Sequence, residues 1–205
     1  MTSHFLLTGL LIGFSIAAPV GPIGVLCIRR TLTQGRVVGL LSGLGAATAD
    51  AFYGCVAGFG LTAVSAILLG QQQWLAAIGG LFLCYLGIKT LRSVSADMPT
   101  QAKQQSFVGA YVSTFFLTIT NPATILSFAA IFAGLGLAGT HGDYLAATVL
   151  VAGVFSGSAL WWLALSTGVS LIRERLNSKQ LIWINRISGL MILGFGVVIL
   201  FSLLA

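Results

Sequence analysis

Residues 5–28 read FLLTGLLIGFSIAAPVGPIGVLCI, an apolar run without a single charged side chain. About 20 residues of α-helix cross the hydrocarbon core of a bilayer, so this run is long enough to do so. Its centre is Pro19-Val20-Gly21-Pro22, and proline removes a backbone donor and blocks the preceding helical turn. The sequence therefore predicts a membrane-spanning helix that is broken near its middle.

Five further apolar runs follow, which predicts an all-α integral membrane protein with six transmembrane helices. Of the 205 residues, 57% are hydrophobic and only 7% are charged, whereas a soluble domain carries about 25% charged residues. This composition excludes an ordinary soluble domain. The predicted spans are residues 5–28, 37–67, 74–92, 107–136, 144–171 and 181–204.

Positive charge is confined to the odd-numbered connections between these spans and to the span ends beside them, with Lys89 and Arg92 at the end of the third span and Arg186 just inside the sixth. The second connection, residues 71–73, has no charge, and the fourth holds only His141 and Asp143. Because Lys and Arg are retained on the cytoplasmic side, we predict a bacterial inner (plasma) membrane protein with both termini outside, in the periplasm. The cations of the odd connections are Arg29, Arg30, Arg36, Lys89, Arg92, Lys103, Arg173, Arg175 and Lys179.

The polar residues 93–106 divide the chain into two sets of three spans, residues 1–92 and 107–205, with weak internal similarity. Each set begins with a proline-centred break, and the second break is Asn121-Pro122. Since three is an odd number, the second set enters the membrane from the opposite face. We therefore predict two inverted three-helix repeats joined by a cytoplasmic linker, a plan that is common in secondary transporters.

The two breaks predict a binding site near the middle of the membrane. Irregular backbone at this depth survives only beside protein or a water-filled cavity. Each break also presents a helix N-terminus, whose amides and partial positive charge suit a carboxylate. We therefore expect Pro19, Gly21, Pro22, Asn121 and Pro122 to line a substrate site; packed kinks without a ligand are the alternative.

Asp50 is the only acid in the interior of a predicted span. A carboxylate at the bilayer centre costs about 3 kcal/mol on insertion scales, so it is a candidate functional residue. It could carry the coupling proton, hold a substrate ammonium, or do both in turn; a structural carboxyl group is the alternative. Tyr53 lies near the same helix face and could share its hydrogen bond. Of the neighbours Trp161 and Trp162, Trp161 is assigned to the site, where it could stack on a cation; packing is the alternative.

Small residues at four-residue spacing occur in the second span of each half. They are Gly39 and Gly43 in the first half, and Gly153 and Gly157 in the second. Such spacing allows close approach of membrane helices, so we predict a packing role for all four. In the first half this packing would bring Asp50 close to the broken first helix.

At this point the residues resemble a known family. Ala18-Pro19-Val20-Gly21-Pro22, the Gly39-x-x-x-Gly43 run before Asp50, and Asn121-Pro122 after Phe115-Phe116 are similar to the LysE/RhtB family of amino-acid exporters. The likeness covers essentially the whole chain in length, span count and order of motifs. It implies export of amino acids or close derivatives from the cytoplasm, driven by the proton-motive force, and family habit implies a homodimer. The motif positions are then the implied substrate site.

Two positions depart from the family pattern. Ile23 stands where family members often have a polar residue, and Ala123 stands where a Lys often follows Asn-Pro. Both departures bear on which amino acid is carried rather than on transport itself.

Other classes of function are weighed against the exporter. A divalent-cation efflux transporter would want several carboxylates or histidines together, and the span interiors supply one acid. A membrane thiol–disulfide reductase would want paired cysteines, but Cys27, Cys55 and Cys84 form no paired spacing and all lie in the first half. A channel remains an alternative function, although the sequence shows no ring of charges that would line a pore. We expect no metal, no cofactor, no nucleic-acid partner and no enzyme activity.

Overall fold

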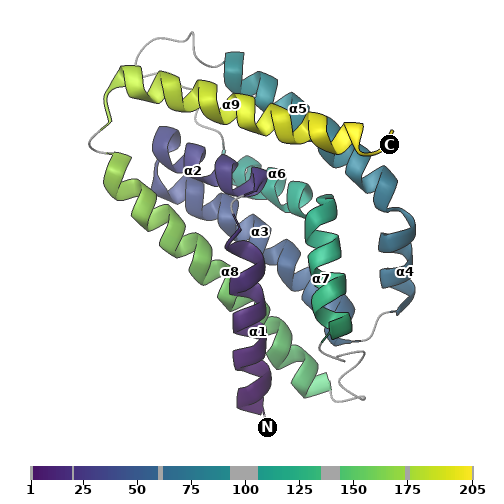
Figure 1. Ribbon diagram of the computed structural model, residues 1–205. Coiled ribbons are helices and arrows are strands. Elements are labelled where there is room, and N and C mark those ends of the chain that lie inside the picture. Colours follow the sequence, from purple (N-terminus) through teal and green to yellow (C-terminus); the bar gives the residue numbers. More distant parts are fainter. Residues whose placement is uncertain are drawn as a thin grey trace.

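The computed structural model describes residues 2–19, 21–59, 62–92, 106–134, 144–173 and 176–204. This part of the chain is helical, without a strand (Figure 1). Its helices are α1 (Thr2–Ala17), α2 (Pro22–Gln34), α3 (Arg36–Gly58), α4 (Thr62–Gly70), α5 (Gln72–Arg92), α6 (Phe107–Ile119), α7 (Pro122–Gly134), α8 (Tyr144–Arg173) and α9 (Ser178–Phe201).

Four of these helices, α3, α5, α8 and α9, are each long and apolar enough to cross a membrane. Two further pairs are bent, α1 and α2 by 80° and α6 and α7 by 59°. Each pair passes the same test of length and apolarity when it is taken as one span, which brings the candidate spans to six. The predicted helix breaks, between α1 and α2 and between α6 and α7, are therefore confirmed.

The second predicted span, residues 37–67, is not one helix. Helix α3 ends at Gly58, and α4 begins only at Thr62. Glycine is a weak helix former, and the apolar run was longer than the roughly 20 residues that a span needs. The excess forms α4, which has nine residues and is too short to span by itself.

The first connection is also shorter than predicted. Helix α2 continues to Gln34, so Arg29 and Arg30 lie within it. Gly35 alone separates α2 from α3, with a φ of 102° that glycine adopts at little cost. The reversal of the chain therefore takes one residue.

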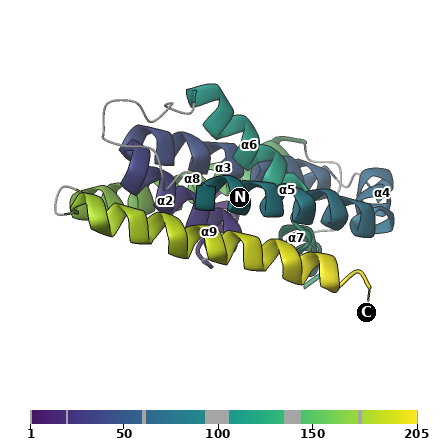
Figure 2. The ribbon, with the colours of Figure 1, turned by 90° about the horizontal axis from the view of Figure 1, so that it is seen from above.

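The described helices pack in four main pairs: α1 on α8, α3 on α8, α3 on α6, and α5 on α9. Helices α5 and α9 lie side by side in both views of the ribbon (Figures 1 and 2). Glycines form the contact of α1 with α8, because a Cβ atom on Gly153 or Gly157 would overlap the carbonyl oxygens of Leu6 or Leu10. Gly9 and Gly13 face the same contact from α1, and the sequence analysis did not single them out.

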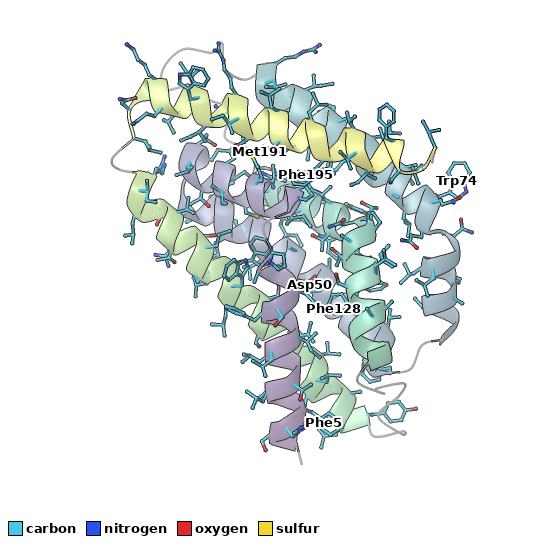
Figure 3. The ribbon with its side chains drawn as sticks, viewed as in Figure 1. Phe5, Asp50, Trp74, Phe128, Met191 and Phe195 are labelled. Carbon is cyan, nitrogen blue, oxygen red and sulfur yellow. The ribbon has the colours of Figure 1, made fainter. Side chains whose placement is uncertain are left out.

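Gly39 and Gly43 face inward from α3. A Cβ atom on Gly39 would overlap the Thr31 hydroxyl of α2, and one on Gly43 would overlap the Trp162 side chain of α8. Any larger residue would push these helices apart. Two turns after Gly43, Asp50 lies in the interior, whereas Trp74 at the periphery is 71% exposed (Figure 3).

Cationic side chains connect three segments at one end of the molecule. The Arg173 Nε atom at the end of α8 donates to the Leu32 carbonyl of α2, at 3.1 Å. The Arg29 Nε atom donates to Asn185 Oδ1 of α9, at 2.8 Å. The first and fifth connections therefore lie at the same end. The predicted linker, residues 93–106, lies outside the described residues except for Ser106.

Candidate functional site

A cavity of about 230 Å³ lies where the two breaks meet α3 and α8. It is smaller than the roughly 300–1,000 Å³ of sites for drug-sized ligands, so it suits a small solute. Its walls come from both bent helix pairs, α1 with α2 and α6 with α7, and from α3 and α8. The residues that line it are Ile16, Ala17, Pro19, Gly21, Pro22, Ile23, Gly24, Ala46, Asp50, Thr118, Asn121, Ala123, Thr124, Ser127 and Trp162.

At the first break, the N-terminus of α2 faces this cavity. Gly21 is the N-cap, and without a side chain it makes no side-chain cap hydrogen bond. Pro22 follows, then Ile23 and Gly24, which belong to the first turn and line the cavity. The amides of a first helical turn lack partners within the helix, and the helix dipole is positive at this end. The first break therefore offers an electropositive wall.

At the second break, the side chain of Asn121 caps α7. Its Oδ1 atom accepts a hydrogen bond from the Ala123 amide at 3.2 Å, and its carbonyl accepts from Thr124 and Ile125. Pro122 lies beside the cavity, in a smaller apolar space that Asn121 shares. The amides at the start of α7 are thus used within the break, unlike those of the α2 cap.

The Tyr53 side chain forms its hydrogen bond at the second break, and not with Asp50. Its hydroxyl donates to the backbone carbonyl of Ile119, the last residue of α6. A carbonyl at a helix end lacks its partner within the helix, so this hydrogen bond satisfies an acceptor that the break exposes. The prediction that Tyr53 shares the hydrogen bond of Asp50 is wrong.

Asp50 is buried at the wall of the cavity, with 3% of its surface exposed. Its Oδ2 atom accepts a hydrogen bond from the Ser158 hydroxyl of α8, at 2.7 Å. The Ser158 oxygen in turn accepts from the Trp162 indole Nε1 atom, at 3.1 Å. Among the described residues that line the cavity, Asp50 is the only one with an ionisable side chain.

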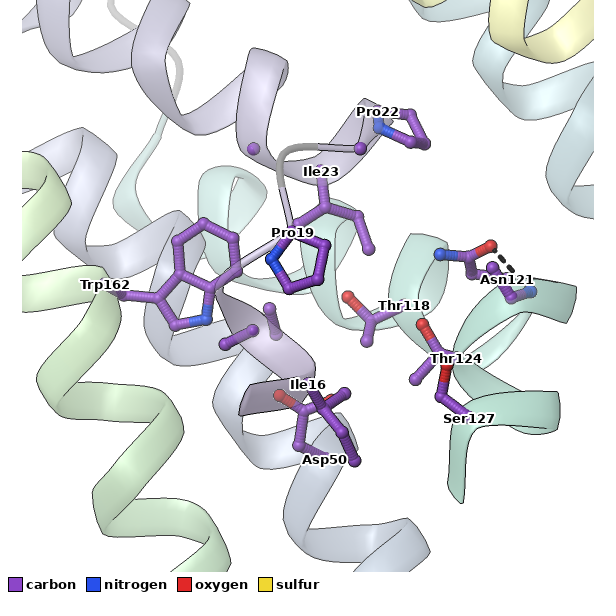
Figure 4. A pocket seen from close by; sticks show the side chains of 15 residues that line it. Ile16, Pro19, Pro22, Ile23, Asp50, Thr118, Asn121, Thr124, Ser127 and Trp162 are labelled. Carbon is purple, nitrogen blue, oxygen red and sulfur yellow. Dashed lines mark hydrogen bonds between the residues drawn. The ribbon is translucent and has the colours of Figure 1, made fainter. Parts of the chain in front are cut away.

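Trp162, not Trp161, lines the cavity (Figure 4). Trp161 packs edge to face on Phe14 of α1, with ring centroids 5.3 Å apart. Neighbouring residues of a helix point in directions about 100° apart, so only one of the two can face the site. The sequence alone could not decide between them, because both side chains are large and aromatic.

Hydroxyl groups form the wall opposite Trp162. Thr118 of α6 and Thr124 and Ser127 of α7 lie on this side (Figure 4). The Thr118 hydroxyl donates to the Thr114 carbonyl at 2.9 Å, which leaves its oxygen able to accept. The sequence analysis did not single these residues out, although Thr118 and Thr124 flank the Asn-Pro break and could have been found there.

Arg30 is a buried charged residue, and the sequence analysis did not predict its structural role. Its side chain is 1% exposed in α2, where a cytoplasmic connection was predicted. The guanidinium donates to three hydroxyls and one carbonyl of α3 and α6 at 2.8–3.0 Å: Ser42, Ser113, Thr114 and the Ala110 oxygen. Arg30 thereby ties α2 to α3 and α6.

The described residues contain no group of three or more His, Cys, Asp or Glu side chains that could hold a metal ion. In the same part of the chain Cys27, Cys55 and Cys84 are free thiols. What the site offers is one carboxylate, an aromatic face, an electropositive helix end and a row of hydroxyls.

Comparisons with known proteins agree over nearly the whole chain. The family described as "LysE type translocator" matches residues 14–203. The Bacillus subtilis protein named "Putative amino acid efflux protein YcgF" is 30% identical, over 94% of this chain and 93% of its own. The uncharacterized membrane protein YrhP of Bacillus subtilis is 28% identical, over 95% and 97%. YahN, an uncharacterized membrane protein of Escherichia coli, is 30% identical, over 70% and 65%. No solved structure matches the chain.

Proposed function

The chain belongs to the LysE translocator family, and from this membership we propose that it is a secondary active transporter that exports amino acids or close derivatives. The relative YcgF is named as an amino acid efflux protein, which supports this substrate class. The observation that carries the proposal is the cavity at which both broken helices meet Asp50.

The walls of the cavity complement the two charged ends of an amino acid. The substrate carboxylate binds at the N-terminus of α2, near Ile23 and Gly24, because free amides and the helix dipole favour an anion. The substrate ammonium binds at Asp50 and against the face of Trp162. The hydroxyls of the opposite wall contact the remainder of the molecule.

Asp50 also couples transport to protons. In the state open to the cytoplasm, the carboxyl group releases its proton and binds the substrate ammonium. In the state open to the outside, it releases the substrate and takes up a proton from that side. Each cycle therefore exchanges one outgoing substrate for an incoming proton, and the proton-motive force drives export.

The two states interconvert by rocking of two inverted three-helix repeats around the cavity. The pattern of helix contacts supports this proposal. The first span contacts the fifth through α1 and α8, and the second contacts the fourth through α3 and α6. The third contacts the sixth through α5 and α9. A two-fold relation between the halves would exchange the first span with the fourth, the second with the fifth and the third with the sixth. This exchange turns the set of contacts into itself, as such a relation requires.

The orientation follows from charge. Arg29 and Arg173 mark the end at which the first and fifth connections lie together. We assign this end to the cytoplasm, because basic residues are retained there. Both termini then face the periplasm of a bacterial inner membrane. A homodimer stays a prediction.

Transport by purified protein in proteoliposomes tests the function. Radiolabelled amino acids are screened for movement driven by a pH gradient, with the wild type and Asp50→Asn. We expect the wild type to move at least one of them and Asp50→Asn to lose gradient-driven movement by tenfold or more, while it inserts normally. Asp97→Asn, in the predicted linker, is the matched control and should behave as the wild type. Undiminished coupled transport by Asp50→Asn would refute the role of this residue.

A further inference from the structure

Ser158 lies behind the cavity wall, in contact with the carboxylate that we assign to proton coupling. It is fully buried in α8 and does not line the cavity. Its hydroxyl contacts two residues that do: it donates to Asp50 and accepts from Trp162. Ser158 is therefore the shared hydrogen-bond partner of the carboxylate and the aromatic face.

The direction of these hydrogen bonds follows from chemistry. An indole N–H is a donor only, so the Ser158 oxygen must accept from Trp162. A serine hydroxyl has one proton, and the 2.7 Å contact directs it at Asp50 Oδ2. Asp50 Oδ2 is then held as an acceptor, which leaves the second carboxylate oxygen for the cavity.

Close packing holds Trp162 in place behind this chain of hydrogen bonds. The side chain of Trp162 rests directly on Gly43 of α3, where even a Cβ atom would overlap it. Residues 158 and 162 are four apart and share one face of α8. The indole N–H therefore has little freedom except toward Ser158, and a molecule that moves the ring also moves that hydrogen bond.

We propose that Ser158 is a positioning residue that orients the Asp50 carboxylate and transmits substrate contact at Trp162 to it. This inference rests on the proposed function and deepens it, because it names the link between substrate binding and proton exchange. In the described part of the chain, Tyr53 is a titratable group near Asp50, and its hydroxyl donates to the Ile119 carbonyl. Among the described residues, the cavity wall contributed by α1, α2, α6, α7 and α8 carries no charged side chain.

Three variants separate this role from simple packing. Ser158→Ala removes the hydroxyl, and Ser158→Thr keeps it. Ser166→Ala is the matched control: Ser166 lies two turns along α8, is equally buried, and its hydroxyl has no hydrogen-bond partner among the described residues. Each variant is reconstituted, and the rate and KM of transport of an amino acid that the wild type carries are measured across a range of pH.

We expect Ser158→Ala to lower the maximal rate about tenfold, because hydrogen bonds to charged groups are strong. Its pH profile should differ from that of the wild type, because the hydroxyl that donates to the Asp50 carboxylate is gone. Ser158→Thr should stay near the wild type in both respects, and Ser166→Ala should match the wild type.

Two outcomes overturn the inference. In the first, the pH profile of Ser158→Ala coincides with those of the wild type and Ser166→Ala. In the second, Ser158→Thr is impaired as severely as Ser158→Ala. These outcomes contradict the inference alone, because the wild type still transports. A wild type that moves no amino acid contradicts the proposed function, and this inference falls with it.

Discussion

At the scale of single residues, Arg30 has a larger structural role than its place in the sequence suggests. A guanidinium inside a membrane protein needs partners for its donors, and Arg30 finds them on two neighbouring helices. Ser42 and Thr114 each donate their own proton to a backbone carbonyl in α3 or α6, so their oxygens are free to accept from Arg30. Neutral groups thus accept from both terminal nitrogens, while the buried Nε atom has no hydrogen-bond partner among the described residues.

Replacement of Arg30 should therefore destabilise the fold. Arg30→Met keeps an unbranched apolar stem but removes the guanidinium, and with it four hydrogen bonds between helices. We expect a loss of about 2–4 kcal/mol in the free energy of unfolding, seen as a melting temperature in detergent lower by about 5–10 °C. Arg36→Met, at an exposed position one residue into α3, is the control. Equal melting temperatures for the two variants would contradict this role of Arg30.

Residue chemistry determined which parts of the site could be predicted from the sequence. Asp50 and Asn121 stand out because each is strongly polar in an apolar run. Ser158 and Thr118 do not, since serine and threonine in membrane helices often bond their own backbone. Their role depends on which helix face meets the cavity, and only the tertiary packing decides that.

At the scale of helices, glycine determines how closely α1 and α8 approach. Gly157 and Gly168 belong to the same helix but differ in their surroundings. A Cβ atom on Gly157 would overlap the Leu10 carbonyl, whereas one on Gly168 would meet open space. The pair of glycines allows a matched test of the contact between α1 and α8.

Gly157→Ala should force α1 and α8 apart and lower the free energy of unfolding by about 1–3 kcal/mol. Gly168→Ala should leave stability unchanged or raise it by up to about 1 kcal/mol, because alanine is the better helix former. Thermal unfolding of the two variants in the same detergent measures the difference. A Gly157→Ala variant as stable as Gly168→Ala would show that the helices do not depend on this contact.

Helix boundaries were predictable only where the chain carries an explicit signal. Both breaks were predicted because proline cannot continue a helix, and α5 begins and ends within about two residues of its predicted span. The separate helix α4 was not predicted, since residues 51–67 contain no charged residue and no proline, and apolarity alone does not say where a helix stops. The continuation of α2 through Arg29 and Arg30 was missed because charged residues were taken to mark a connection.

At the scale of the whole molecule, six apolar segments and two breaks follow from the sequence, but the cavity does not. It forms because glycines bring α3 and α8 together and because the two breaks reach the same place from opposite halves of the chain. The weak internal similarity predicted a relation between the halves. It could not predict that Trp162, rather than Trp161, completes the wall.

The central claim is that substrate and proton compete for Asp50 in this cavity. Proton release on substrate binding tests it most directly, in a weakly buffered solution of purified protein to which a transported amino acid is added. We predict that the wild type releases up to about one proton for each amino acid bound, at a pH where Asp50 is largely protonated, and that Asp50→Asn releases none. Binding without proton release by the wild type at every pH, or equal release by Asp50→Asn, would contradict the claim.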